Sequence, residues 1–357
     1  MNPLRLVNIT ENGAILLGRY FEVDGFGGRP VRVVTHAHID HLNELEQSLF
    51  TASRIVATPI TIEFIKSLGY FSHRALRLLN QKTHILGYHE EFLYEDEKLI
   101  LYQADHIPGA AQVLLESQNH KLAYTGDFKL TGKTEVIREP DVLVIESTYG
   151  HPSNMRPFKE YVPSLLIDIV NEGLRKYGIV FIYGYHGKLQ EAMNILREGG
   201  IDATFLLPGK ICTSTKILEK YGYNIGQHIC MEGDDVPKWK PKRPVVVFQH
   251  FNKAKYRKLG NDSLHIVLSG WLFEEPFKKI DECTYIVGLS DHADFSDLIK
   301  YVELSNPRII VVDGSREGSP GELVHALLER GFCAITLPKM RDLTGENKCA
   351  EITGSPL

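Results

Sequence analysis

Four potential metal ligands lie within six positions of the sequence, in the segment His36-Ala-His38-Ile-Asp40-His41. Residues two apart on an extended chain face the same side, so His36 and His38 can bind one ion. A turn after them offers Asp40 and His41 to a second ion. Imidazole and carboxylate suit zinc or manganese, and because no cysteine lies nearby, the pattern favours a catalytic site over a closed structural one.

Two more potential ligands follow apolar runs later in the chain. His106 follows the run at 98–104, and Asp127 follows the run at 121–125. Each alone is typical of a loop or turn residue. If strands of one sheet deliver their carboxyl ends to a common edge, however, His106 completes the ligand set of the first ion and Asp127 bridges both ions. Two ions about 3.5 to 4 Å apart can activate water for an in-line displacement at phosphorus.

The same placement after an apolar run recurs at Glu146, His292 and Asp313. Hydrolysis of a phosphodiester needs a proton donor to the leaving oxygen, and a histidine held by a carboxylate can fill that role near neutral pH. We therefore predict His292, supported by Glu146, as the general acid. The alternative for His292 is an ordinary helix-start residue, in a segment that Asp291 or Asp294 caps.

The composition is typical of a soluble globular protein. The 357 residues carry 40 Lys and Arg against 45 Asp and Glu, and 43% are apolar, which excludes a disordered, collagen-like or coiled-coil chain. No run approaches the ~20 apolar residues that span a bilayer, and the first residues lack a signal-peptide pattern. We expect a cytoplasmic protein with no membrane contact. The cysteines form no C-x-x-C pair, and we predict them to be reduced and buried.

Strand-like runs come first along the chain, and helices then alternate with strands. The predicted strands lie at 31–35, 98–104, 121–125, 142–145, 178–183, 204–207, 245–248, 264–268, 285–290 and 308–312. The predicted helices lie at 188–197, 214–221, 294–304 and 321–330. Such alternation indicates a parallel α/β arrangement in the middle of the chain.

Charge is unevenly distributed. Residues 151–273 hold 17 Lys and Arg against 11 Asp and Glu, whereas the rest of the chain is acidic overall. The segment Lys238–Lys258 carries eight cations, no acidic residue and four aromatic rings. Because cations bind phosphates and rings stack on bases, this segment suits a nucleic-acid groove, although a solvated surface is the simpler alternative. From it we predict four substrate contacts, Lys253, Lys255, Arg257 and Lys258.

Two other short segments are predicted to bind phosphate. Ser147 and Thr148 adjoin Glu146, and Gly187-Lys188 lies at a predicted helix start. Free N–H groups and the helix dipole attract anions there. An ordinary turn explains Gly187 equally well.

Several segments resemble a known family. VVTHAHIDHL, DHIPGAAQ and AYTGDF resemble the successive motifs of the metallo-β-lactamase fold, with Asp24 of FEVDGFGG at the place of its first-strand aspartate. VIESTYG, YGYHGKLQEAMNIL, LSGW and GLSDHADFSDL resemble the β-CASP subgroup, whose members are nucleases. The resemblance covers nearly the whole chain.

The resemblance implies an α/β fold, an αββα metallo-β-lactamase sandwich with an inserted α/β β-CASP domain. The catalytic domain would comprise residues 1–152 and 274–357, and the insert 153–273. This division coincides with the basic middle of the chain.

The resemblance also implies the roles of the site residues. One metal would be bound by His36, His38, His106 and Asp127, and the other by Asp40, His41 and Asp127. Asp24 would support the cluster through hydrogen bonds, because metal-bound histidines need such partners. The implied catalytic residues are Asp40, Asp127, Glu146 and His292. The cofactors would be two divalent ions, zinc or alternatively manganese.

One position departs from the family pattern. RNA-cleaving members usually have a histidine after the last strand and DNA-cleaving members typically have a valine, whereas this chain has Asp313 in VVDGS. An aspartate could ligate the second metal through oxygen, which favours a harder ion such as manganese. We hypothesise that Asp313 is that ligand.

The predicted function is metal-dependent hydrolysis of nucleic acid. FEVDGFGG and DHIPGAAQ resemble Artemis-like DNA-processing members, and GKLQEAMNIL, LSGW and SDHADF resemble ligase-associated DNA exonucleases, whereas ESTYG is equally at home in RNA-processing members. We expect a DNA exonuclease acting from 5′ ends in DNA repair. The alternatives are an RNA-processing β-CASP ribonuclease, a small-molecule metallo-hydrolase, and a non-catalytic nucleic-acid-binding subunit.

Overall fold

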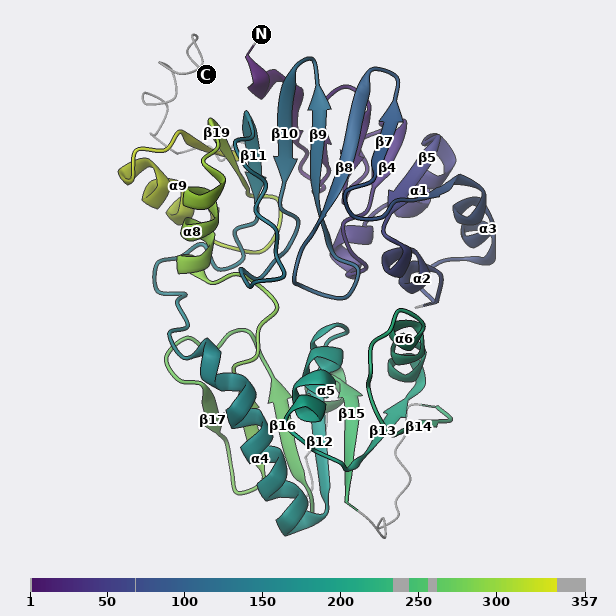
Figure 1. Cartoon of the computed structure of the whole chain (residues 1–357), viewed down its shortest axis with the longest axis vertical. Helices are drawn as coiled ribbons and strands as arrows, with labels where there is room; N and C mark the ends of the chain where they lie inside the picture. The colour runs from purple at the N-terminus through teal and green to yellow at the C-terminus, as the bar shows by residue number, and fades with distance from the viewer. Residues whose placement is uncertain (1, 68, 234–243, 256–261, 339–357) are drawn as a thin grey trace. The chain divides into compact units, whose positions relative to one another are not determined.

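The computed structural model describes residues 2–67, 69–233, 244–255 and 262–338, and the chain forms two compact units (Figure 1). The first unit comprises Met1–Met155 and the segment that begins at His292. The second unit comprises Arg156–Asp291. The second unit is therefore an insertion in the sequence of the first.

The first unit contains two sheets that share an apolar core. One sheet has its strands in chain order, β1 (Val7–Ile9), β2 (Ile15–Leu17), β3 (Phe21–Val23), β4 (Val31–Val33), β5 (Arg54–Ala57) and β6 (Thr83–Ile85). The other has the order β20 (Ala334–Leu337), β19 (Ile309–Asp313), β11 (Val142–Ile145), β10 (His120–Tyr124), β9 (Ala111–Ser117), β8 (Glu97–Gln103) and β7 (Glu91–Tyr94).

Alternating side chains place the second sheet between two cores. In β11, Val142 and Val144 pack into the core shared with the first sheet, whereas Leu143 and Ile145 pack against helices. Because both faces of the strand are covered, it reads as a continuous apolar run in the sequence. Neighbouring β19 follows the same alternation.

Helices cover the outer faces of both sheets (Figure 1). Beside the first sheet lie α1 (Leu45–Thr51), α2 (Pro59–Ser67) and α3 (His73–Lys82). Against the second sheet pack α8 (Phe295–Ser305) and α9 (Pro320–Glu329). Short 3₁₀ turns occur at η1 (Pro3–Leu6) and η2 (Ile39–Leu42). The first unit is thus an αββα sandwich, as predicted.

The second unit is an α/β domain with a mainly parallel sheet. Its strand order is β14 (His228–Met231), β13 (Thr204–Pro208), β15 (Val245–His250), β12 (Ile179–Gly184), β16 (Leu264–Leu268), β18 (Thr284–Val287) and β17 (Phe277–Lys279), the last antiparallel. Its helices are η3 (Lys159–Tyr161), α4 (Val162–Tyr177), α5 (Lys188–Glu198), α6 (Gly209–Lys220) and α7 (Asn252–Lys255). Residues of α4 and α5 pack on one face of this sheet.

Local sequence explains where several helices begin and end. Helix α4 ends at Gly178, whose φ of 74° is a left-handed conformation that glycine adopts readily, and its N–H donates to Leu174 O at 3.0 Å. Helix α8 begins after Asp294, whose carboxylate accepts from the Asp297 N–H at 3.0 Å. The predicted strands and helices are confirmed with shifts of a few residues, the largest in α6, which begins at Gly209 directly after β13.

The predicted second boundary of the insert, at 273/274, is wrong. Strands β17 and β18 extend the sheet of the second unit, because β18 pairs with β16 from His265↔Thr284 to Leu268↔Val287. The chain therefore returns to the first unit at His292 rather than at residue 274. Among the described residues, each helix is too short or too polar to cross a membrane.

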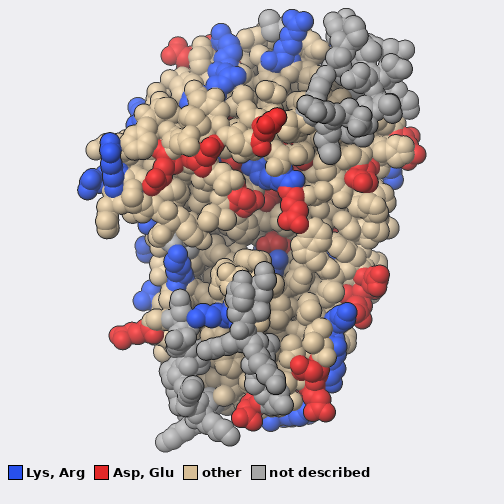
Figure 2. Space-filling model, turned by 180° about the vertical axis from the view of Figure 1, so that it is seen from behind, with Lys and Arg blue, Asp and Glu red and all other residues tan. Residues whose placement is uncertain are grey.

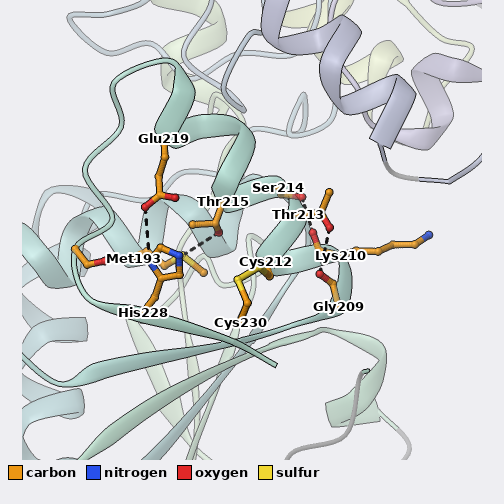
Figure 3. The surroundings of a disulfide bond; sticks show 11 residues. Met193, Gly209, Lys210, Cys212, Thr213, Ser214, Thr215, Glu219, His228 and Cys230 are labelled. Atoms are coloured by element: carbon orange, nitrogen blue, oxygen red, sulfur yellow. Dashed lines mark hydrogen bonds and ion pairs between the residues drawn. A yellow bond between two sulfur atoms is a disulfide. The ribbon is translucent and has the colours of Figure 1, made fainter. Parts of the chain in front are cut away.

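The prediction that all cysteines are reduced is also wrong. Cys212 of α6 and Cys230 of β14 form a disulfide with their Cα atoms 5.5 Å apart (Figure 3). Beside it, His228 Nδ1 lies 3.6 Å from Glu219 Oε1, which also joins β14 to α6. Cys333 is disulfide-bonded as well, whereas Cys283 is a buried thiol. The disulfide thus fastens the edge strand of the second unit to a helix.

Removing this disulfide should destabilise the second unit. The two cysteines are 18 residues apart, and closing a loop of this size stabilises a fold by about 3 kcal/mol. We expect Cys212→Ser combined with Cys230→Ser to lower the free energy of unfolding by about that amount in guanidinium titrations without reductant. The disulfide of Cys333 is present in the wild type and in the double variant, so it does not contribute to the difference between their free energies of unfolding. Equal midpoints for the two proteins would contradict the prediction.

Candidate metal centre

The strands of the second sheet bring the predicted site residues to one edge. Strands β8 and β10 are both antiparallel to β9, and β10 is parallel to β11, which is parallel to β19. Their carboxyl ends therefore share an edge, and they are followed by His106, Asp127 and Glu146. The first sheet joins this edge through β4, because Thr35 O accepts from Ala111 N at 3.0 Å.

A first group of ligand atoms comes from His36, His38, His106 and Asp127, which lie within 4.8 Å of one another. His38 Nδ1 lies 3.2 Å from His36 Nε2 and 3.0 Å from His106 Nε2. Asp127 Oδ2 lies 3.7 Å from His36 Nε2 and 3.8 Å from His106 Nε2. Tetrahedral zinc requires ligand atoms about 3.4 Å apart, so the spacing fits a zinc-sized ion.

A second group comes from Asp40, His41 and Asp127. His41 Nε2 lies 3.1 Å from Asp127 Oδ2 and 3.4 Å from Asp40 Oδ2. This nitrogen is buried and has no hydrogen-bond partner among the described residues. A buried polar atom without a partner is costly, and a cation between His41 and the two carboxylates would satisfy it. The donor set therefore fits a second divalent ion, with Asp127 common to both groups.

The Asp24 carboxylate supports the second group through hydrogen bonds. Its Oδ1 accepts from the Thr35 N–H at 2.8 Å, and its Oδ2 lies 2.8 Å from His41 Nδ1. Because His41 donates from Nδ1, its Nε2 carries the lone pair that a metal ligand needs. The Asp24 backbone has φ 53°, an unusual conformation for a residue other than glycine, which here accompanies the fixed carboxylate.

The buried imidazoles do not share one protonation state. Burial and the neighbouring His41, His106 and His38 hold the pKa of His36 well below its usual range, so His36 is a neutral ligand. Burial also opposes charge on His41, but Asp127, Asp40 and Asp24 outweigh it and raise the pKa of His41 well above the usual value. Burial likewise opposes ionisation of Asp127, but His41 dominates and holds its pKa well below the usual value. Metal binding must therefore displace a proton from His41.

Glu146 and His292 form a pair beside the metal ligands. Glu146 Oε2 lies 3.0 Å from His292 Nδ1, and Glu146 Oε1 accepts from the Phe128 N–H at 2.9 Å. The rings of His292 and His106 have centroids 4.8 Å apart. Burial raises the pKa of Glu146, although the adjacent His292 opposes this shift. Asp127, Glu146 and His292 themselves offer atoms within 4.8 Å of one another.

Comparison with known proteins gives relatives but no match to a family model. An "uncharacterized protein in lig 3′region" of Acidianus ambivalens is 48% identical over 138 residues, which are 38% of this chain and 98% of that protein. A "probable RNase MJ4" of Methanocaldococcus jannaschii is 26% identical, over 86% of each chain. A "probable DNA ligase" of Opitutus terrae is 27% identical over 84% of this chain, but this chain spans only 28% of it.

A solved structure also matches. It is a protein of unknown function from Enterococcus faecalis V583, with a TM-score of 0.56 and 16% identity, covering 88% of this chain and 80% of that one. This likeness concerns the fold alone. The RNase relatives align with a chain that has a two-sheet sandwich, an HxHxDH segment and an inserted α/β domain.

The chain is thus related to β-CASP nucleases, and it has the metallo-β-lactamase fold with an inserted domain. The second unit, Arg156–Asp291, is that insertion in the sequence. The Glu146–His292 pair joins a residue before the insert to the residue that follows it.

The structure does not bring Asp313 into either metal-ligand group. Asp313 is in none of the ligand groups found among the described residues. Its Oδ1 accepts from the Ser315 N–H at 2.8 Å, and its Oδ2 forms an ion pair with Arg316 Nη1 at 2.6 Å. The hypothesis that Asp313 is a ligand is therefore corrected, because its carboxylate already has strong partners.

Two arginines, one buried and one largely buried, support the site and were not predicted. Arg316 donates from Nη2 to the carbonyl oxygens of Gly13 at 3.1 Å and Asp24 at 3.0 Å. Arg32, in β4, donates to His41 O at 3.1 Å and has its pKa lowered to about 10 by burial. A charged residue inside an apolar strand is the signal that could have indicated Arg32.

The predicted phosphate contacts are mostly engaged elsewhere. Ser147 Oγ donates to Asp313 O at 2.7 Å, whereas Thr148 is half-buried beside it. Gly187 caps α5 and donates its N–H to Gln190 Oε1 at 2.8 Å. Lys188 is largely buried and pairs with Asp291 at 3.0 Å. Phosphate binding by these residues stays a prediction.

The predicted basic contacts are only partly described. Lys253 is a half-buried residue of α7, and Lys255 ends the same helix. Arg257 and Lys258 lie outside the described residues. On the face of the first unit that Figure 2 shows, Lys and Arg side chains are scattered among Asp and Glu side chains rather than gathered in one patch.

Removing Asp127 should empty both metal groups, because its carboxylate belongs to each. We expect about two zinc ions per chain in the wild type and well under one in Asp127→Ala, measured by inductively coupled plasma mass spectrometry. Asp313→Asn is the matched control and should keep the wild-type content. Loss of one ion from Asp313→Asn would restore that residue as a ligand.

Metal affinity should fall as the pH is lowered. The pKa of His41 is raised, so most of His41 becomes protonated as the pH falls below that pKa. This proton competes with the metal. We expect zinc affinity to drop by about tenfold per pH unit for each proton displaced, in chelator competition between about pH 8 and about pH 6. Affinity that is independent of pH over this range would rule out proton displacement.

Proposed function

We propose that this chain is a metal-dependent nuclease that hydrolyses phosphodiester bonds, and that it degrades DNA from 5′ ends in DNA repair. The observation that carries the proposal is the sharing of Asp127. Its carboxylate belongs to both metal-ligand groups and also lies within 4.8 Å of Glu146 and His292. A nucleophile at the ligand groups and a proton donor at His292 would then act on the same phosphodiester.

Divalent cations in the two groups would supply an activated water and offset the charge that develops on the phosphoryl oxygens. The chain itself supplies the proton. Glu146 holds His292 through Nδ1, so Nε2 is the atom that donates to the leaving oxygen. The His292 side chain is 18% exposed, which lets a substrate reach it, whereas Glu146 is fixed behind it by Phe128 N–H.

The relatives' names support both DNA and RNA as substrates. The 48% identical relative is named for a position 3′ of lig, and another relative is a probable DNA ligase. These names favour DNA, as do FEVDGFGG and DHIPGAAQ in the sequence. RNA is the second candidate, because probable RNase MJ4 and an RNase J-like protein align with most of the chain. We propose zinc as the metal, with manganese as the alternative.

A non-catalytic binding subunit and a small-molecule hydrolase have less support. A non-catalytic subunit would need neither the two metal-ligand groups nor the Glu146–His292 pair, which we call the acid pair. This chain has all of them. A small-molecule hydrolase does not explain the segment Lys238–Lys258 of the inserted domain, which carries eight cations and no acidic residue.

End-labelled oligonucleotides test the substrate and the direction of attack. Single-stranded DNA and RNA of matched sequence, labelled at the 5′ or the 3′ end, are incubated with the zinc-loaded or manganese-loaded protein. We expect release of labelled mononucleotide or a short product from 5′-labelled DNA, with slower cleavage of RNA. Faster cleavage of RNA would favour the second candidate. Cleavage of neither polymer would overturn the proposal.

Replacing His292 tests its role in proton transfer. We expect His292→Ala to lower kcat by about 10²- to 10⁴-fold while zinc content stays at the wild-type value, because its proposed role is proton donation and it is not among the ligands proposed for the two metals. The matched control is His89→Ala, since His89 is an exposed histidine that also pairs with a glutamate, at 3.1 Å from Glu135. Unchanged kcat in His292→Ala would exclude it as the general acid.

A further inference from the structure

Two aromatic rings stack at the carboxyl edge of the inserted domain's sheet. Gly184 of β12 and His250 of β15 are register partners, and the next residues are Tyr185 and Phe251. Their ring centroids are 5.0 Å apart, with 24° between the ring planes. The Phe251 N–H donates to Gly184 O at 2.9 Å, and His250 contacts Tyr185 edge-on at 5.4 Å. Backbone and ring contacts thus fix the pair before any ligand binds.

Tyr185 is largely open to solvent. It is 47% exposed, whereas Tyr183, two residues earlier in β12, is 2% exposed. A single exposed aromatic ring is common on protein surfaces. A ring that is held by stacking on a neighbour and is also half exposed can, in addition, receive another planar group without being ordered first.

The topology of the sheet marks this place for ligand binding. The chain leaves β12 toward β13, which lies on the β15 side, and it leaves β15 toward β16, which lies on the opposite side of β12. Right-handed connections that run in opposite directions leave on opposite faces of the sheet. Open α/β sheets bind ligands at such a switch point, outside the carboxyl ends of the strands. Tyr185 and Phe251 stand at the carboxyl ends of these two strands.

Further aromatic and charged groups follow the same edge. Trp271, which is 53% exposed, comes after β16, the other neighbour of β12. Lys253 follows Phe251 in α7. Lys188 begins α5 three residues after Tyr185, and its Nζ lies 3.0 Å from Asp291, the residue before His292. The edge that carries the stacked rings is therefore followed by a second exposed ring, at Trp271, and by an ion pair, between Lys188 and Asp291.

We propose that Tyr185, backed by Phe251, stacks on one unpaired base of a single-stranded polynucleotide that binds to the inserted domain. This inference rests on the proposed nuclease function. The occupant is single-stranded because bases in a duplex stack on each other and present only their edges. Over Arg156–Asp291 the insert carries 19 Lys and Arg against 16 Asp and Glu, a small positive excess that suits the phosphates of such a strand.

An abasic scan tests the stacked base. Binding of zinc-loaded protein to labelled single-stranded DNA and RNA is measured by fluorescence anisotropy, in a His292→Ala background that slows turnover. Tyr185→Ala should raise Kd by about 5- to 150-fold, the range for loss of one stacked base, and Tyr185→Trp should restore the affinity. With oligonucleotides that lack one base at successive positions, the effect of Tyr185→Ala should disappear at one position. A merely structural role would weaken binding equally at every position.

The control is Tyr223→Ala. Tyr223 is 41% exposed and lies between α6 and β14, at the amino-terminal edge of the same parallel sheet, so its removal should leave Kd unchanged. If DNA and RNA bind but Tyr185→Ala has no effect, or the same effect at all abasic positions, the stacking role is overturned while the nuclease function stands. If neither polymer binds or is cut by the parent protein, both proposals fail.

Discussion

The site depends on the balance of charge in a buried place. Imidazoles and carboxylates from separate segments meet where His36 and His41 are fully buried and Asp127 is nearly so. Without a cation, a proton on His41 is the main compensation for Asp127. The pKa of His41 is raised by its carboxylate neighbours, whereas that of His36 is lowered by burial and by the neighbouring imidazoles. Metal binding, the contact of His41 with the Asp24 carboxylate and the packing of both sheets around the site therefore all depend on positive charge at this edge.

The parts of the fold that sequence predicts are those that local pattern determines. Strand β11 was predictable because both of its faces are apolar, and α8 because Asp294 caps it. The HxHxDH segment was informative because its density of ligands has no explanation in packing. The gathering of His106 and Asp127 followed from one assumption, that their strands end at a common edge, and the antiparallel pairing of both strands with β9 bears it out.

The parts that sequence did not predict depend on contacts between distant elements. Asp313 was predicted to be a ligand because the sequence does not reveal its ion pair with Arg316. That pair forms only because the loop after β19 folds back. The disulfide joins Cys212 and Cys230 only because β14 lies at the sheet edge beside α6. The end of the insert was missed because residues 274–291, with five Asp and Glu against two Lys, have the acidic composition of the first unit although β17 and β18 extend the sheet of the second. Each case needs the order of strands, which no local pattern contains.

The insert separates Glu146 from His292 both in the sequence and in the order of synthesis. Glu146 and His292 are 146 residues apart, whereas the ligands of both metal groups all lie at or before Asp127. During translation, the side chains of both metal-ligand groups leave the ribosome before the inserted domain is made, and His292, the proposed proton donor, emerges only after that domain is complete. The inserted domain thus separates, in the order of synthesis, the residues that can hold metal from the proposed general acid. An unfinished polypeptide would carry the first capacity without the second.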